Sequence, residues 1–421
     1  MKISFLIHNA YGIGGTIATT FNLAQALAER HEVEIVSVLR HRERPQLVLD
    51  PKVSLRALVD LRHEKEHPLH LRPARVFPAA EYRHRQYSEL TDERIGRYLE
   101  SVDADAVIGT RPGLNVHLAL QAPRRVVRVG QEHLALDRHS PRLRTALRRA
   151  YRGLDVLTTV TEADAAAYRR KMWLPGVRVQ VLPNSVPDPV LPASDGTAKV
   201  VVAAGRLVAG KRYDLLIEAF ALVAAEHPDW RLRIYGTGEE RGRLRRLIES
   251  LGLYDNVFLM GAAAPLEAEW VKGSIGAAAS DFESFGMTIV EAMRCGLPMV
   301  STDCPHGPGE IIEDGADGRL VPVGDRDALG AALLELVRDD GLRRRMGRTA
   351  MENARRFAPA AVVRQAEDLI EEAVSARASG RRPARDRARI RSALTGGGFA
   401  AQDAARVLRS SALGTVRRGR R

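Results

Sequence analysis

The sequence predicts an α/β protein made of two Rossmann-like domains, each with a parallel sheet. Strand and helix patterns alternate from the start, with an apolar stretch at 3–7 and an amphipathic one at 16–30. A chain of 421 residues is too long for one ordinary core. Residues 183–196 hold four prolines and interrupt the alternation, which restarts at residue 199.

The elements follow in order along both halves. In the first half the segment 41–93 is rich in Arg and His and is hard to assign, apart from a strand near 53–59. The other first-half strands are expected at 3–7, 33–39, 106–110, 125–129 and 156–160. The second half repeats the pattern with strands at 199–204, 231–235, 257–260, 275–279 and 298–301, and helices dominate from 326 to 376.

The positive charge of the chain is concentrated at its end. The net charge is +12, and residues 376–421, with 13 Arg and two Asp, carry +11 of it. The rest is nearly neutral, at +1. We therefore predict a basic, disordered tail over 377–421 that could tether the protein to an anionic membrane surface. A nucleic-acid-binding protein is the alternative that this tail suggests, but a neutral body with 5% aromatic residues disfavours it.

The two cysteines, Cys295 and Cys304, stand nine positions apart without a zinc-type pattern, which favours a reducing cytoplasm. The N-terminal apolar stretch of five residues indicates a strand and not a signal peptide. The sequence has no run of eighteen apolar residues, so no membrane-spanning helix is predicted. A cytoplasmic protein is expected, with a peripheral position at the inner face of the membrane as a further expectation.

The most informative passage is D-F-E-S-F-G-M-T-I-V-E-A-M-R-C-G-L-P, which begins at Asp281. It places Glu283 in a loop and Glu291 on a helix, between two apolar strands. Eight helical positions would separate these carboxylates by roughly 12 Å, too far to share a proton or a metal ion. They could grip two hydroxyl-bearing parts of one extended ligand, such as the two sugars of a nucleotide-sugar.

This passage resembles the retaining glycosyltransferases of family 4, which have the GT-B fold, and the resemblance implies that the two domains face each other across a cleft. The resemblance implies that Glu283 contacts the transferred sugar and Glu291 the nucleotide ribose, with Phe285, Gly286 and Met287 in the same donor pocket. It implies a nucleotide diphosphate-sugar donor, with a UDP-sugar favoured. The implied acceptor is a glycan, a lipid-linked sugar or a cell-envelope polymer.

A glycine and two cations follow the first strand of the second domain. Gly205, Arg206 and Lys211 stand where ligands of open α/β sheets bind, outside the carboxyl end of a strand. An Arg and a Lys five positions apart could stabilise a departing diphosphate, although lone cations are often merely solvated. The pattern G-R-L-x-x-x-K matches the family, as does the G-x-G element at Gly236. No acidic pair is placed to hold a metal at this edge, so we expect neither a metal nor another cofactor.

The first domain offers a glycine loop and a histidine. Gly14 and Gly15 open a helix whose free amides suit a phosphate, but the loop lacks the third glycine of the dinucleotide fingerprint. This argues against an NAD enzyme. The resemblance implies that one of these amides approaches the donor diphosphate. It also implies that His133, expected in the loop 130–133, hydrogen-bonds to the transferred sugar.

The resemblance also completes the expected domain plan. Residues 1–185 form the acceptor-side domain, 186–358 the donor-binding domain, and 359–376 a helix that crosses back to the first domain. A second class with this fold, the nucleotide-sugar epimerases, lacks the Glu283–Glu291 passage and is kept as an alternative. No carboxylate is placed as a nucleophile, which favours front-side departure assisted by the acceptor hydroxyl.

Overall fold

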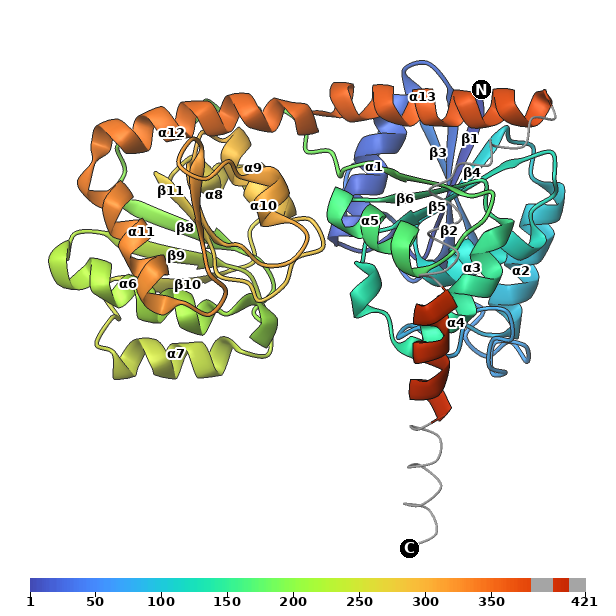
Figure 1. Cartoon of the computed structure of the whole chain (residues 1–421), viewed down its shortest axis with the longest axis horizontal. Helices are drawn as coiled ribbons and strands as arrows, with labels where there is room; N and C mark the ends of the chain where they lie inside the picture. Colours follow the sequence, from blue (N-terminus) through green and yellow to red (C-terminus); the bar gives the residue numbers. More distant parts are fainter. Residues whose placement is uncertain (380–396, 409–421) are drawn as a thin grey trace, which may run out of the picture. The chain divides into compact units, whose positions relative to one another are not determined.

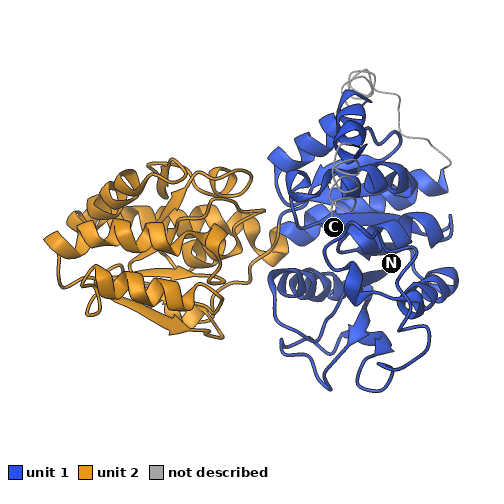
Figure 2. Ribbon diagram, turned by 90° about the horizontal axis from the view of Figure 1, so that it is seen from below, with its two compact units in different colours: residues 1–183, 362–421 blue, residues 184–361 orange. Residues whose placement is uncertain are grey.

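The computed structural model describes residues 1–379 and 397–408 and separates the chain into two compact units (Figures 1 and 2). Unit 1 consists of Met1–Pro183 and Val362–Arg421, and unit 2 of Asn184–Ala361. Each unit holds one sheet in which all paired strands are parallel, as predicted for two Rossmann-like domains. Within the described residues, no helix is both long enough and apolar enough to cross a membrane.

Unit 1 has a seven-stranded sheet in the order β3-β2-β1-β4-β5-β6-β7, so the strand order reverses between β1 and β4. Its strands are β1 (Lys2–Ile7), β2 (Glu32–Arg40), β3 (Val53–Asp60), β4 (Ala106–Gly109), β5 (Val127–Glu132), β6 (Val156–Thr159) and β7 (Arg178–Val181). Its first five helices are α1 (Gly15–Ala28), α2 (Glu89–Ser101), α3 (Pro112–Gln121), α4 (Pro141–Ala150) and α5 (Glu162–Lys171), with short 3-10 turns at His84–Gln86, Leu136–Arg138 and Tyr151–Gly153.

Two apolar cores cover the two faces of this sheet. Helices α2 to α5 pack on one face, and α1 shares the other with α13 (Pro359–Ala378). The buried stripe of α13 recurs at helical spacing and consists of Val362, Val363, Ala366, Leu369 and Ile370. Glu367, on the same helix, is ion-paired with Arg30 and lies 3.1 Å from His31 Nε2. The predicted return of the last long helix to the first domain is confirmed.

Unit 2 has a six-stranded parallel sheet in the order β10-β9-β8-β11-β12-β13. Its strands are β8 (Val200–Ala204), β9 (Arg231–Tyr235), β10 (Val257–Gly261), β11 (Ile275–Ala278), β12 (Met299–Thr302) and β13 (Gly318–Val321). Its helices are α6 (Tyr213–Glu226), α7 (Arg241–Ser250), α8 (Glu267–Trp270), α9 (Met287–Arg294), α10 (Pro308–Ile311), α11 (Arg326–Arg338) and α12 (Asp340–Asn353), with 3-10 turns at Ala209–Lys211 and Ala354–Phe357.

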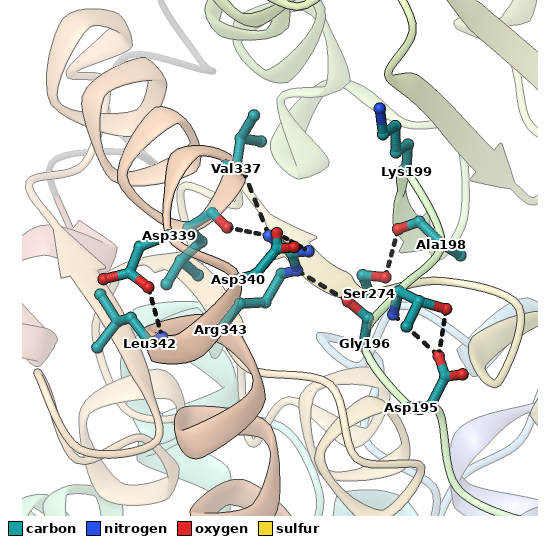
Figure 3. Close-up of polar contacts among 12 residues, drawn as sticks. Asp195, Gly196, Ala198, Lys199, Ser274, Val337, Asp339, Asp340, Leu342 and Arg343 are labelled. Carbon is teal, nitrogen blue, oxygen red and sulfur yellow. Dashed lines mark hydrogen bonds and ion pairs between the residues drawn. The ribbon is translucent and has the colours of Figure 1, made fainter.

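Two buried arginines hold the linker before β8 on unit 2. Arg343 of α12, only 2% exposed, donates to the carbonyls of Gly196 (3.1 Å) and Leu336 (2.6 Å), as Figure 3 shows for the first of these. Arg294 of α9 donates in the same way to the Pro187 carbonyl, at 3.1 Å. Because hydrogen bonds from charged donors are among the stronger ones in proteins, these contacts fix a stretch that has no helix or strand of its own.

The prediction that residues 377–421 are disordered is wrong for 397–408, which form a helix on unit 1 (dark red in Figure 1). The reason is Asp403, 4% exposed, which is ion-paired with Arg144 and Arg148 of α4. Burial opposes ionisation, but the two guanidinium groups hold the pKa of Asp403 below its usual value. The prediction is also wrong for 377–378, which end α13, and residues 380–396 and 409–421 of the predicted tail lie outside the described residues.

Candidate active site

Two neighbouring strands of unit 2 are each followed by a glycine, and the two glycines are in contact. Gly205 follows β8 and Gly236 follows β9, and Gly205 N–H donates to the Tyr235 carbonyl at 2.9 Å. A Cβ atom on Gly236 would lie 1.8 Å from the Gly205 carbonyl oxygen, and φ at Gly236 is +146°. Neither space nor backbone conformation permits a side chain there. The two predicted donor-binding glycines are therefore brought together, and packing alone already requires Gly236.

Lys211 and Glu283 form an ion pair at this same edge of the sheet. Lys211 Nζ donates to Glu283 Oε1, and Ser280 Oγ donates to the same oxygen at 2.7 Å. The two side chains are only 22% and 14% exposed. Lys211 also reaches the glycine contact, since a Cβ on Gly205 would lie 3.5 Å from Lys211 Cε. Among the described residues no donor bonds to Glu283 Oε2, which leaves that oxygen for a ligand.

Arg206, predicted to act with Lys211, is placed differently. It follows Gly205 directly but is exposed, and its side chain has neither a hydrogen bond nor an ion pair within the described residues. Sequence reasoning missed Ser280, which orients the glutamate, and the buried Tyr213. Burial, together with the charge of Glu283, raises the pKa of the Tyr213 phenol. Only their spacing from Lys211 and Glu283 could have pointed to them.

The loop after Glu283 is shaped by Gly286, whose φ of +114° precedes Met287, the first residue of α9. Phe285 is 5% exposed and packs edge-on against Phe357 at 5.4 Å between ring centroids. Its side chain is therefore part of the core, and only its main chain is available to a ligand.

The second glutamate of the motif, Glu291, lies in α9 and is half-buried. Burial raises the pKa of its carboxyl to about 7, against the opposing effect of the Trp270 indole. The carboxyl thus titrates in the physiological range, far above its usual value of 4.5.

Three predicted site residues belong to unit 1. Gly14 and Gly15 open α1, and a Cβ on either would meet nothing within 4 Å, so packing does not explain the two glycines. His133 directly follows β5 and is half-buried. The expected loop 130–133 is wrong, because β5 continues to Glu132 and pairs with β6 along its whole end.

Glu132 is a further residue that sequence reasoning passed over. It is 1% exposed and accepts hydrogen bonds from the Tyr151 hydroxyl and from Asn115 Nδ2 (3.2 Å). The other carboxylate oxygen of this residue, Oε2, lies 3.4 Å from His139 Nε2. This closed network holds the end of β5 in place, immediately before His133. Within residues 1–379 and 397–408, no group of three His, Cys, Asp or Glu side chains could hold a metal ion.

Family models match both halves of the chain. Residues 13–188 match the model described as Glycosyltransferase Family 4, and residues 191–353 match the one described as Glycosyl transferases group 1. The boundary between the two matches falls in the linker that Arg294 and Arg343 hold on unit 2.

Two relatives extend this likeness. An exopolysaccharide phosphotransferase of Streptomyces coelicolor is 36% identical over 413 residues, which are 94% of this chain and 43% of the relative. A poly(glycerol-phosphate) alpha-glucosyltransferase of Bacillus subtilis is 29% identical over 180 residues, which are 42% of this chain and 26% of the relative. The chain therefore spans less than half the length of either relative.

Solved structures agree with both units. A mutant of S. aureus TarM, solved with fondaparinux, alpha-GlcNAc-glycerol and UDP, has a TM-score of 0.71 at 16% identity and covers 88% of this chain and 100% of that one. Sucrose-phosphate synthase from Thermosynechococcus elongatus has a TM-score of 0.72 at 18% identity, with 89% and 100% covered. Each half of the chain therefore matches a glycosyltransferase family model, and the two units have the fold of these GT-B structures.

Proposed function

We propose that the protein is a retaining, metal-independent glycosyltransferase that moves a sugar from a UDP-sugar to a hydroxyl of a lipid-linked glycan or cell-envelope polymer. The observation that carries this proposal is the Lys211–Glu283 pair beside the Gly205–Gly236 contact. It joins a cation, a carboxylate oxygen and exposed main chain at the sheet edge where ligands of such folds bind.

The Lys211 ammonium group would stabilise the departing diphosphate. An ammonium group has three N–H donors, and Glu283 engages one of those of Lys211. The others could bind the donor diphosphate, which gains negative charge as the bond to the sugar breaks. Fixed positive charge stabilises that state more than the ground state. Arg206, exposed one position beyond Gly205, would be the second cation.

Glu283 would bind the transferred sugar. Its open Oε2 can accept a hydrogen bond from a sugar hydroxyl, and this bond would strengthen as positive charge develops on the ring. The bond from the anomeric carbon to the diphosphate oxygen breaks, and a bond to the acceptor oxygen forms on the same face. The departing diphosphate takes the acceptor proton, so atoms and charge balance and configuration is retained.

The remaining predicted residues would complete the donor site. Glu291 would accept hydrogen bonds from the ribose, one amide of Gly14 or Gly15 would approach the diphosphate, and His133 would bond to the transferred sugar. UDP bound to TarM and the polyol-phosphate acceptor named for the B. subtilis relative support the choice of donor and acceptor. A nucleotide-sugar donor would put the reaction in the cytoplasm.

Two substitutions at the ion pair test this proposal. Glu283→Gln should keep UDP affinity within a few-fold and lower sugar transfer ten- to a hundredfold, because a hydrogen bond to a charged group contributes about 1.5–3 kcal/mol. Lys211→Met should weaken UDP binding in a thermal-shift titration and also slow transfer. Lys272→Met is the matched control, since Lys272 is an exposed lysine of unit 2 that pairs with Glu269 at 2.8 Å. It should change neither quantity.

Product analysis decides between the reaction classes. A transferase yields UDP and a glycosylated acceptor whose linkage keeps the donor configuration, whereas an epimerase consumes the donor without acceptor and yields an isomeric sugar. Transfer should persist in EDTA. A wild-type rate in Glu283→Gln, inverted product, or activity that chelator abolishes and manganese restores would each contradict the corresponding part of the proposal.

The Arg-rich end of the chain adds a proposal about location. Basic segments gain about 1 kcal/mol per residue near an anionic surface, so the full chain should sediment with anionic vesicles at low salt and release as salt rises. Deleting 409–421, which follows the helix docked on unit 1, should weaken sedimentation without changing transfer to a small acceptor. Failure of the full chain to sediment at low salt would remove the tether from the proposal.

A further inference from the structure

The strand order of unit 1 reverses between β1 and β4, and ligands of open parallel sheets bind outside the carboxyl ends of the strands at such a point. His8 directly follows β1, and Arg111 is the second residue after β4. The segment 61–88 contacts both of these residues. Tyr87 places its hydroxyl 2.9 Å from His8 Nδ1, and the buried Glu81 is ion-paired with Arg111.

Next to these contacts a tyrosine ring faces solvent between two guanidinium groups. Tyr82 is 73% exposed, and the Cζ atoms of Arg83 and Arg111 lie 5.2 and 5.3 Å from the centre of its ring. Most large aromatic side chains of the protein are buried, and this exposed ring has a cation on two sides. We call Tyr82, Arg83 and Arg111 the arginine–tyrosine platform.

The platform carries positive charge that the described residues do not neutralise. The Glu81 carboxylate pairs with the Arg111 guanidinium and also accepts the Arg83 backbone N–H at 3.0 Å. The Arg83 guanidinium itself donates to neutral groups, namely Gln86 Oε1 at 2.9 Å and the Tyr82 hydroxyl at 3.1 Å. In addition, Arg111 Nε is buried without a hydrogen-bond partner within the described residues. Arg94 Nε and Arg148 Nε are buried in the same way, so the charge open to a ligand is that of Arg83.

His8 sits beside the platform and stays neutral. Burial is the main cause, and the charges of Arg111 and Arg83 add to it, so that the pKa of His8 falls to about 3. Arg83 Nη1 lies 3.5 Å from His8 Nε2. A neutral imidazole next to an uncompensated guanidinium suits a ligand that combines hydroxyl groups with an anion.

We propose that the arginine–tyrosine platform binds a phosphodiester group of an anionic polymer acceptor, with the adjoining polyol or sugar lying against Tyr82. A planar guanidinium matches phosphate geometry with two parallel hydrogen bonds, and a tyrosine ring offers an apolar face with a polar edge. This inference rests on the proposed function and names the chemical class of its acceptor. One ring and one uncompensated cation fit a single phosphodiester unit better than a charged membrane plane.

Direct binding tests the platform without relying on turnover. The full chain is titrated by calorimetry with a synthetic glycerol-phosphate hexamer, and with maltohexaose as the neutral counterpart. The hexamer should bind at low salt and weaken as salt rises, and maltohexaose should bind at least tenfold more weakly. Arg83→Gln should lower hexamer affinity at least tenfold and Tyr82→Ala several-fold. Arg85→Gln, an exposed neighbour that loses the same charge, should match the wild type.

The possible outcomes separate this inference from the function on which it rests. Hexamer affinity that Arg83→Gln leaves unchanged, or equal affinity for maltohexaose, overturns the platform. Binding of phosphatidylglycerol vesicles that depends on Arg83, without hexamer binding, assigns the phosphate to a lipid and also overturns it. UDP affinity, measured in parallel on the same samples, reports on unit 2, and its absence in the wild type would instead contradict the proposed function. Arg111→Gln is avoided because it would strand the buried Glu81 carboxylate.

Discussion

Donor affinity should depend on pH through Glu291, because a ribose-binding carboxylate accepts hydrogen bonds best when it is ionised. Burial raises the pKa of this group to about 7. If only the ionised form binds, the apparent dissociation constant is multiplied by one plus the ratio of protonated to ionised carboxyl. With a pKa of about 7, that factor is about 11 at pH 6 and about 1 at pH 8. Affinity for a UDP-sugar should therefore rise about tenfold between pH 6 and pH 8.

Calorimetry with a UDP-sugar is the suitable assay, since its diphosphate bears no titrating proton in this range, unlike UDP itself. Titrations in buffers of different ionisation enthalpy at pH 7 should show release of about half a proton on binding. Glu291→Gln should remove both effects, and Glu249→Gln, which changes an exposed acid of α7, should keep them. A pH dependence that persists in Glu291→Gln would refute the assignment of the ribose contact.

The same carboxyl also predicts how stability varies with pH. Its folded pKa lies above the unfolded value near 4.5, so its contribution to stability is complete below pH 4.5 and is lost as pH rises through about 7. The difference amounts to about 3 kcal/mol as an upper bound. Urea unfolding of unit 2 at pH 5 and pH 8 should show a drop in the wild type that is smaller in Glu291→Gln. Equal drops in the two proteins would contradict the burial argument.

Three further predictions concern packing. Arg343→Met should cost about 3–5 kcal/mol of unfolding free energy in urea, because several buried carbonyls lose a charged donor, whereas Arg344→Met at its exposed neighbour should cost under 1 kcal/mol. Gly236→Ala should unfold unit 2 or lower its melting temperature sharply, whereas Gly14→Ala should leave stability unchanged and reduce transfer only if a donor approaches that amide. Asp403→Asn should release the helix 397–408, seen as new protease sensitivity in that stretch.

Local patterns predicted the sheets and the linker well, because parallel strands and their helices leave periodic apolar signals. Contacts between distant residues left no such signal. Lys211 and Glu283 are 72 positions apart, and nothing in either local pattern shows that they pair. The helix 397–408 was missed for the same reason. The many arginines of the segment 377–421 indicate disorder, and nothing local shows that Asp403 pairs with Arg148, 255 positions away. The segment 61–88 has almost no regular structure, so its place at the sheet edge depends on side chains such as Glu81.

Because α13 packs on unit 1, unit 1 cannot complete its fold during translation until unit 2 has been synthesised. One face of the unit 1 sheet is completed by Val362, Leu369 and Ile370, which are made after all of unit 2. At about 5–20 residues per second, the intervening stretch takes roughly 10–40 s to translate. During that interval the nascent unit 1 exposes an apolar stripe beside α1. A fragment ending at Pro183 should expose this apolar stripe permanently and self-associate. Adding the α13 segment as a separate peptide should cover the stripe and keep the fragment monomeric.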